Sequence, residues 1–111
     1  MKRIYHGRRF FDHGSEVRFV DDGATFPGLL LPLRLDLVNH SPTGFEWGYG
    51  GSGPAQLALA MLAHHLGDDR RALEHYFDFK FRVIAGLSHD EWILTSDEID
   101  RHLEEIARRT A

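Results

Sequence analysis

The sequence contains no cysteine, which excludes disulfides, thiolate zinc sites and cysteine nucleophiles. It also lacks a long hydrophobic run, because the longest, Leu57 to Ala63, is far shorter than the roughly 20 residues that span a bilayer. No apolar stretch typical of a signal peptide follows Met1. We therefore expect a cytoplasmic protein without a membrane partner.

An excess of positive charge is also missing. The sequence contains 13 Lys and Arg but 17 Asp and Glu, so the formal net charge is −4. We therefore do not expect nucleic acid to be the partner. Hydrophobic residues make up 42% of the 111 residues, which is enough for one core. We expect a single domain over residues 1–111.

The first half has strand patterns. Alternation predicts strands at 2–5, 8–11 and 16–20, and residues 21–23 form a turn signal. Leucines at every second position predict a further half-buried strand over 33–38. A last extended segment places three aromatic residues on one side: Phe45, Trp47 and Tyr49.

The second half begins with a helix. Ser52 or Gly53 can cap it, and Gly67 is suited to end it. Because residues 57–63 are all apolar, this helix is expected to be buried on nearly every side.

Two more helices are predicted after it. One is capped by an aspartate at 68 or 69 and extends to Gly86; a short apolar strand or packing segment covers 92–94. Thr95 and Glu98 have capping-box spacing and open the last helix. The chain is therefore predicted to be α+β, with a small antiparallel sheet from the N-terminal half packed against about three helices from the C-terminal half.

The most unusual stretch is glycine-rich and runs from Gly44 to Gln56, directly into the first helix. Such a loop can receive an anion at free backbone N–H groups, but the spacing is neither that of a P-loop nor that of a dinucleotide fingerprint. Tight turns and close packing are the favoured interpretation. Aromatic residues here and on the second helix, where Phe79 faces away from Phe77 and Phe81, suggest an exposed interface. The candidate ligand- or partner-binding residues are Trp47, Tyr49, Gly50, Gly51, Ser52, Gly53, Gln56 and Phe79.

A family resemblance rests on this stretch. The block SPTGFEWGYGGSGPAQLAL, residues 41–59, resembles the signature of a family of small uncharacterised bacterial, archaeal and phage proteins, a domain of unknown function. The resemblance extends to residues 5–7, Tyr76, Phe79 and residues 92–95. It implies no activity and no catalytic residues, but it suggests that such proteins travel on phages and other mobile elements.

The eight histidines lack metal-ligand spacing, so we predict neither a metal nor a cofactor. The best metal candidates are His64, His65 and His75. Asp12-His13 and His89-Asp90 suggest hydrolase chemistry, although no nucleophile elbow is present.

Three hypotheses about function follow. The first is a non-catalytic binding or protein-interaction module that self-associates and has a protein partner. The second is a phage or mobile-element inhibitor of a host defence system, which binds a protein complex or sequesters a nucleotide signal. The third is a minimal hydrolase that depends on a metal or on histidine and carboxylate groups.

Overall fold

A four-stranded antiparallel sheet forms one layer of the computed structural model, which describes residues 2–12, 14–22 and 24–110. Its strands are β1 (Arg3–Phe10), β2 (Gly14–Asp21), β3 (Leu29–Leu30) and β4 (Glu91–Thr95), in the order β3-β2-β1-β4. The strands predicted at 2–5 and 8–11 are thus one strand. Gly7 keeps it continuous, because it pairs with both Val17 and Trp92 and the Trp92 indole lies directly over it.

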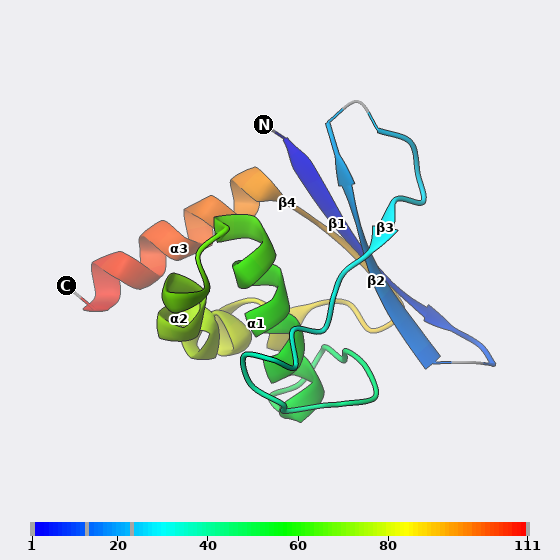
Figure 1. The fold of residues 1–111 in the computed structure, drawn as a ribbon, viewed down its shortest axis with the longest axis horizontal. Coiled ribbons are helices and arrows are strands. Elements are labelled where there is room, and N and C mark those ends of the chain that lie inside the picture. The colour runs from blue at the N-terminus through cyan, green and yellow to red at the C-terminus, as the bar shows by residue number, and fades with distance from the viewer. Residues whose placement is uncertain (1, 13, 23, 111) are drawn as a thin grey trace.

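Three helices form the second layer, on one side of the sheet (Figure 1). They are α1 (Ser52–Leu66), α2 (Asp69–Arg82) and α3 (Ser96–Thr110), and a short 3-10 helix, η1 (Ile84–Gly86), follows α2. The prediction of an α+β fold with an antiparallel sheet and three C-terminal helices is confirmed. In the part of the chain that the structure describes, every helix is too short or too polar to cross a membrane.

The helix boundaries follow local chemistry. Asp68 caps α2 by accepting a hydrogen bond from the backbone N–H of Arg71, and Gly67 ends α1 in the left-handed conformation. The predicted capping box is present: Thr95 Oγ1 accepts from the Glu98 N–H, and Glu98 Oε1 accepts from the Thr95 N–H. The strand predicted at 92–94 is β4.

The core lies between the layers and centres on α1. Every residue from Gly53 to Ala63 is buried, as the continuous apolar run predicts. Tyr5 and Val17 join this core from the sheet, while Phe79 and Ile99 join it from the other helices.

The prediction of a strand over 33–38 is wrong, because the chain turns there. Arg34 has a left-handed φ of 56°, and the Leu37 N–H donates to the Arg34 carbonyl at 3.1 Å. Neighbouring backbone groups bond to a side chain instead of a strand: the Gln56 amide donates to the carbonyls of Leu33 and Val38. The alternating leucines therefore pack a loop against the core.

Candidate functional site

The glycine-rich segment is a packing device where it enters α1. A Cβ on Gly53 would lie 2.5 Å from Cβ of Glu46, and one on Gly51 would lie 2.6 Å from the Tyr49 ring. The N-cap is Gly51, without a side-chain hydrogen bond, so the prediction that Ser52 or Gly53 caps the helix is wrong. At Gly53 the backbone comes too close to Glu46 to accept a side chain without a shift, whereas at Gly51 the exposed Tyr49 ring can turn aside.

Besides Gly53, three of the candidate residues are buried and structural: Trp47, Gln56 and Phe79. Trp47 is 1% exposed, and its Nε1–H donates to the His89 carbonyl at 2.9 Å. Gln56 is 0% exposed, and besides its two donated bonds its Oε1 accepts from the N–H groups of His40 and Ser41.

Phe79 is also 0% exposed and belongs to the core. It does face away from Phe77 and Phe81, as predicted, but it is the inward ring. Phe77 is 58% exposed while Ala72 is buried, so these two residues lie on different faces of α2.

Glu46 is part of a cover over Trp47 rather than a free carboxylate. Arg9 donates to both of its oxygens, at 2.8 and 3.0 Å, and the same guanidinium lies 4.8 Å from the centroid of the Trp47 ring. Both oxygens of Glu46 are therefore occupied by Arg9, and this ion pair covers the Trp47 ring.

The histidines proposed as metal ligands have separate partners. His64 Nδ1 lies 2.8 Å from the Tyr5 hydroxyl, His65 Nε2 lies 2.6 Å from the Asp100 carboxylate, and His75 lies beside Glu74. Over the described ranges, no group of three or more His, Cys, Asp or Glu is placed to hold a metal ion.

Burial perturbs both members of the Tyr5–His64 pair. Burial raises the pKa of Tyr5 to about 12, and burial together with the charge of Arg3 lowers the pKa of His64. The neutral imidazole can therefore accept the Tyr5 hydroxyl hydrogen. Of the two hydrolase hints, His13 lies outside the described residues, and the His89–Asp90 pair is exposed on the surface.

Of the candidates, Tyr49 is an exposed aromatic residue, and Gly50 and Ser52 are also exposed. Together with three exposed side chains of α2, Tyr49 forms what we call the aromatic surface: Tyr49, Leu73, Phe77 and Phe81. Their exposed fractions are 52%, 40%, 58% and 54%. Phe77 and Phe81 pack edge to face with centroids 5.1 Å apart, and the Lys80 ammonium lies 4.8 and 4.1 Å from these centroids. Because a Cβ on Gly50 would lie 2.9 Å from the Phe81 ring, the glycine-rich loop and α2 share this surface.

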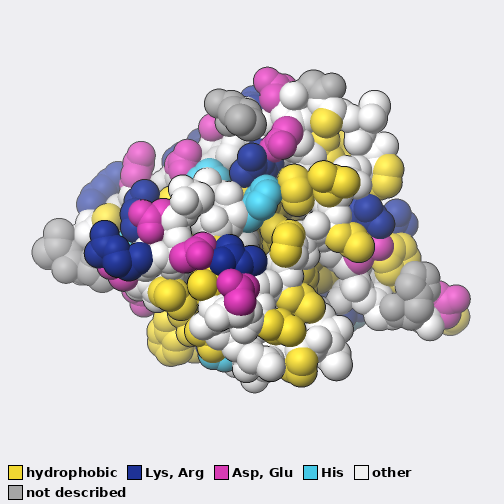
Figure 2. Space-filling model, viewed as in Figure 1, with side chains coloured by type: hydrophobic (Ala, Val, Ile, Leu, Met, Phe, Trp, Pro, Cys, Tyr) yellow, Lys and Arg dark blue, Asp and Glu magenta, His cyan; other side chains and the backbone are white. Residues whose placement is uncertain are grey.

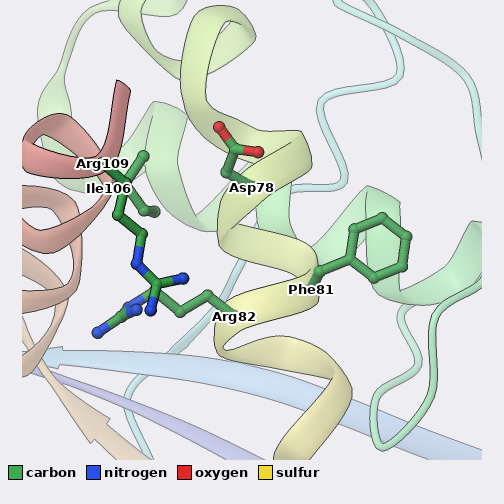
Figure 3. A pocket seen from close by; sticks show the side chains of 5 residues that line it. All are labelled: Asp78, Phe81, Arg82, Ile106 and Arg109. Atoms are coloured by element: carbon green, nitrogen blue, oxygen red, sulfur yellow. The ribbon is translucent and has the colours of Figure 1, made fainter. Parts of the chain in front are cut away.

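An open groove of about 480 Å³ adjoins this surface between α2 and α3. It is lined by Asp78, Phe81, Arg82, Ile106 and Arg109. In Figure 3, Arg82 from α2 and Arg109 from α3 extend toward each other in the space between the helices, whereas the Phe81 ring turns away from them. The groove is therefore basic on its α3 side.

His102 holds one of these arginines in place. Its Nδ1 accepts a hydrogen bond from Arg82 Nε at 3.2 Å. Burial, then the charges of Arg82 and Arg101, lower the pKa of His102, so its ring is neutral at pH 7 and free to accept. With Nε committed to His102, the terminal nitrogens of Arg82 remain to face the groove.

Sequence reasoning missed the groove and both of its arginines. Asp78 and Arg82 are one helical turn apart, which gives a local signal, but Arg109 joins them only through the packing of α3 on α2. No periodicity in the sequence reports that contact.

The aromatic surface and the groove are the features to set beside known proteins. No curated protein and no solved structure matches this chain. Residues 5–105 match the family described as a family of unknown function (DUF6166). The match covers nearly the whole chain, as the resemblance of the glycine-rich block predicts, and the chain belongs to this family.

Proposed function

We propose that this chain is a non-catalytic protein-interaction module that associates with a second copy of itself through the aromatic surface. The observation that carries the proposal is the row of exposed apolar side chains on α2, Leu73, Phe77 and Phe81, each one turn after the last. Large contiguous apolar patches of this kind mark interaction sites in soluble proteins. Figure 2 shows hydrophobic side chains gathered at the edge of the molecule where α2 lies.

Charge along one side of the row bears on how a second copy packs. With 3.6 residues per turn, Glu74 and Asp78 lie on one side of Phe77, whereas Lys80 on the other side is buried, with its ammonium over the Phe77 and Phe81 rings. When two α2 helices pack in parallel about a two-fold axis, the acidic sides of the two copies lie at opposite edges of the contact. Antiparallel packing would instead bring the two acidic sides together, so the parallel arrangement is the one proposed.

Light scattering at micromolar concentration tests the association. We expect a dimer of the 12.7 kDa chain, and we expect Phe77→Ser to give a monomer with an unchanged melting temperature, because this side chain is already largely exposed. Ile93→Ser is the matched control, since Ile93 is 56% exposed but lies on β4, away from α2; it is expected to remain a dimer. A monomeric wild-type protein, or a dimeric Phe77→Ser variant, would refute the proposal.

The absence of cysteine allows the orientation to be tested separately. In the parallel arrangement the two copies of Leu73 lie close together, whereas antiparallel packing sets Leu73 near Phe81 of the other copy. Leu73→Cys is therefore expected to form a disulfide-linked dimer under mild oxidation, and Ile93→Cys is expected to stay unlinked. Efficient linking through position 93, with none through position 73, would place the interface on the sheet.

A further inference from the structure

We propose that the groove between α2 and α3 binds a small phosphate ester whose organic part carries hydroxyl groups. The phosphate lies between Arg82 and Arg109, and a hydroxyl donates to Asp78. This site is distinct from the aromatic surface, although the two adjoin at Phe81.

The first observation is uncompensated positive charge. Two guanidinium groups, those of Arg82 and Arg109, line one groove. Like charges in one groove repel each other unless an anion lies between them. Among the residues that the structure describes, neither Arg82 nor Arg109 forms an ion pair with a carboxylate, whereas most other arginines do. Figure 2 shows arginine or lysine side chains gathered near the C-terminal end of α3.

The second observation is the orientation of Arg82. Its Nε is held by His102, which comes from α3 and is neutral, so the guanidinium is fixed without its charge being cancelled. A guanidinium so fixed offers its terminal N–H groups in the planar fork that suits phosphate oxygens. Arg101, whose charge also reaches His102, adds to the positive field on this side.

The third observation concerns the rest of the groove. Its volume, about 480 Å³, lies within the range of roughly 300–1,000 Å³ that is typical of small-molecule sites. Asp78 lines the same groove from α2 and has no ion pair among the described residues. A carboxylate there repels a second phosphate but accepts hydrogen bonds from hydroxyl groups, and Ile106 supplies an apolar wall. The lining thus suits one phosphate joined to a polyhydroxylated part.

Calorimetric titration of the wild-type protein tests this site. Ribose 5-phosphate and adenosine 5′-monophosphate are the two probes, and inorganic phosphate and ribose are the controls. We expect both esters to bind, phosphate to bind more weakly and ribose not to bind. Comparable affinity for the two esters would identify the sugar phosphate as the recognised part, and tighter binding of the nucleotide would add the base. No heat from either ester up to millimolar concentration would overturn the proposal.

Variants then locate the binding. Arg109→Ala is expected to weaken ester binding about tenfold or more, because it removes one charged donor pair. Arg108→Ala is the matched control: Arg108 is the neighbouring exposed arginine, pairs with Glu105 and does not line the groove, so binding is expected to stay within about twofold. Equal loss in both variants would indicate general attraction to the helix end and overturn the site.

Two further arms separate this proposal from its alternatives. Phe77→Ser is expected to bind the esters normally and Arg109→Ala to remain dimeric, so that failure of the groove and failure of the interface give different results. A short polyglutamate peptide that binds more tightly than either ester, with the loss again at Arg109, would show that the groove recognises an acidic protein segment and would overturn the phosphate assignment.

Discussion

Helices α1 and α2 lie against each other but differ in how far they are buried and in where their apolar side chains face. In α1, all residues from Gly53 to Ala63 are buried, so its sequence is constrained by packing on every side. In α2, the buried residues are Ala72, Phe79 and Lys80, while Leu73, Phe77 and Phe81 face outward. Hydrophobicity alone therefore does not locate the core of this protein. α1 stabilises the fold, and the outer face of α2 carries the exposed apolar row that we propose as an interface.

The test with the largest expected effect makes the same substitution, leucine to alanine, in both helices. Leu59→Ala in α1 is expected to cost about 2–5 kcal/mol of the free energy of unfolding, because Leu59 is fully buried and a cavity remains. Leu73→Ala in α2 is expected to cost less than about 1 kcal/mol, since that side chain is 40% exposed. Urea denaturation followed by circular dichroism measures both; similar losses would mean that the two helices are equally part of the core.

A second test examines the entrance to α1. Gly53→Ala is expected to cost about 1–3 kcal/mol, because the new methyl group would meet Glu46, whose side chain is held by Arg9. Gly86→Ala is the matched control, since nothing lies within 4 Å of the corresponding Cβ position. Melting temperatures distinguish the two variants. A neutral Gly53→Ala would show that the glycine-rich segment moves easily, which would reopen the possibility that it closes on a ligand.

The smallest expected effect is a pH dependence of the stability, which arises from His64 at the C-terminal end of α1. The pKa of His64 is lowered by burial and then by Arg3, with an opposing effect of Asp21, while His65 acts in the same direction as Arg3. Since the unfolded chain takes up this proton more readily, stability is expected to fall as the pH decreases below about 6.5, until the folded form is protonated too. The pKa of His102 is lowered as well, so this residue also makes the stability fall as the pH decreases.

His64→Asn isolates this contribution, because the amide oxygen can still accept from the Tyr5 hydroxyl but does not titrate in this range. Denaturation midpoints between pH 7 and pH 5 are expected to decline less in this variant than in the wild type. An identical decline would assign the pH dependence to other groups.

Local chemistry made much of the fold predictable from the sequence. The α1 and α2 boundaries at Gly67 and Asp68 and the Thr95–Glu98 capping box depend on residues within one turn of each other, and all are found as expected. The strand at 33–38 was wrong because the side chain of Gln56, distant in sequence, takes its backbone hydrogen bonds. Alternation reports which side chains face inward, but it does not report what the backbone bonds to.

The candidate site was only partly predictable for a similar reason. Aromatic residues in the glycine-rich segment and on α2 do meet at one surface, through Gly50 and Phe81. Burial divides them, however, and a single sequence does not show that Trp47 and Phe79 are inside while Tyr49 is outside. The two arginines of the groove become neighbours only through tertiary packing.

The position of β4 has a consequence for how this protein is made. β4 pairs with β1, so that Ile4 lies opposite Thr95, and the sheet joins the two ends of the chain. While the chain is being synthesised, the β1–β2 hairpin emerges early but keeps an unpaired edge until residue 95 has left the ribosome. Trp92 and Leu94, which complete the core over Gly7 and Tyr5, arrive with the same strand. The sheet is therefore completed only after residue 95 has emerged, and a nascent chain stalled before β4 exposes a strand edge that chaperones or neighbouring chains can bind.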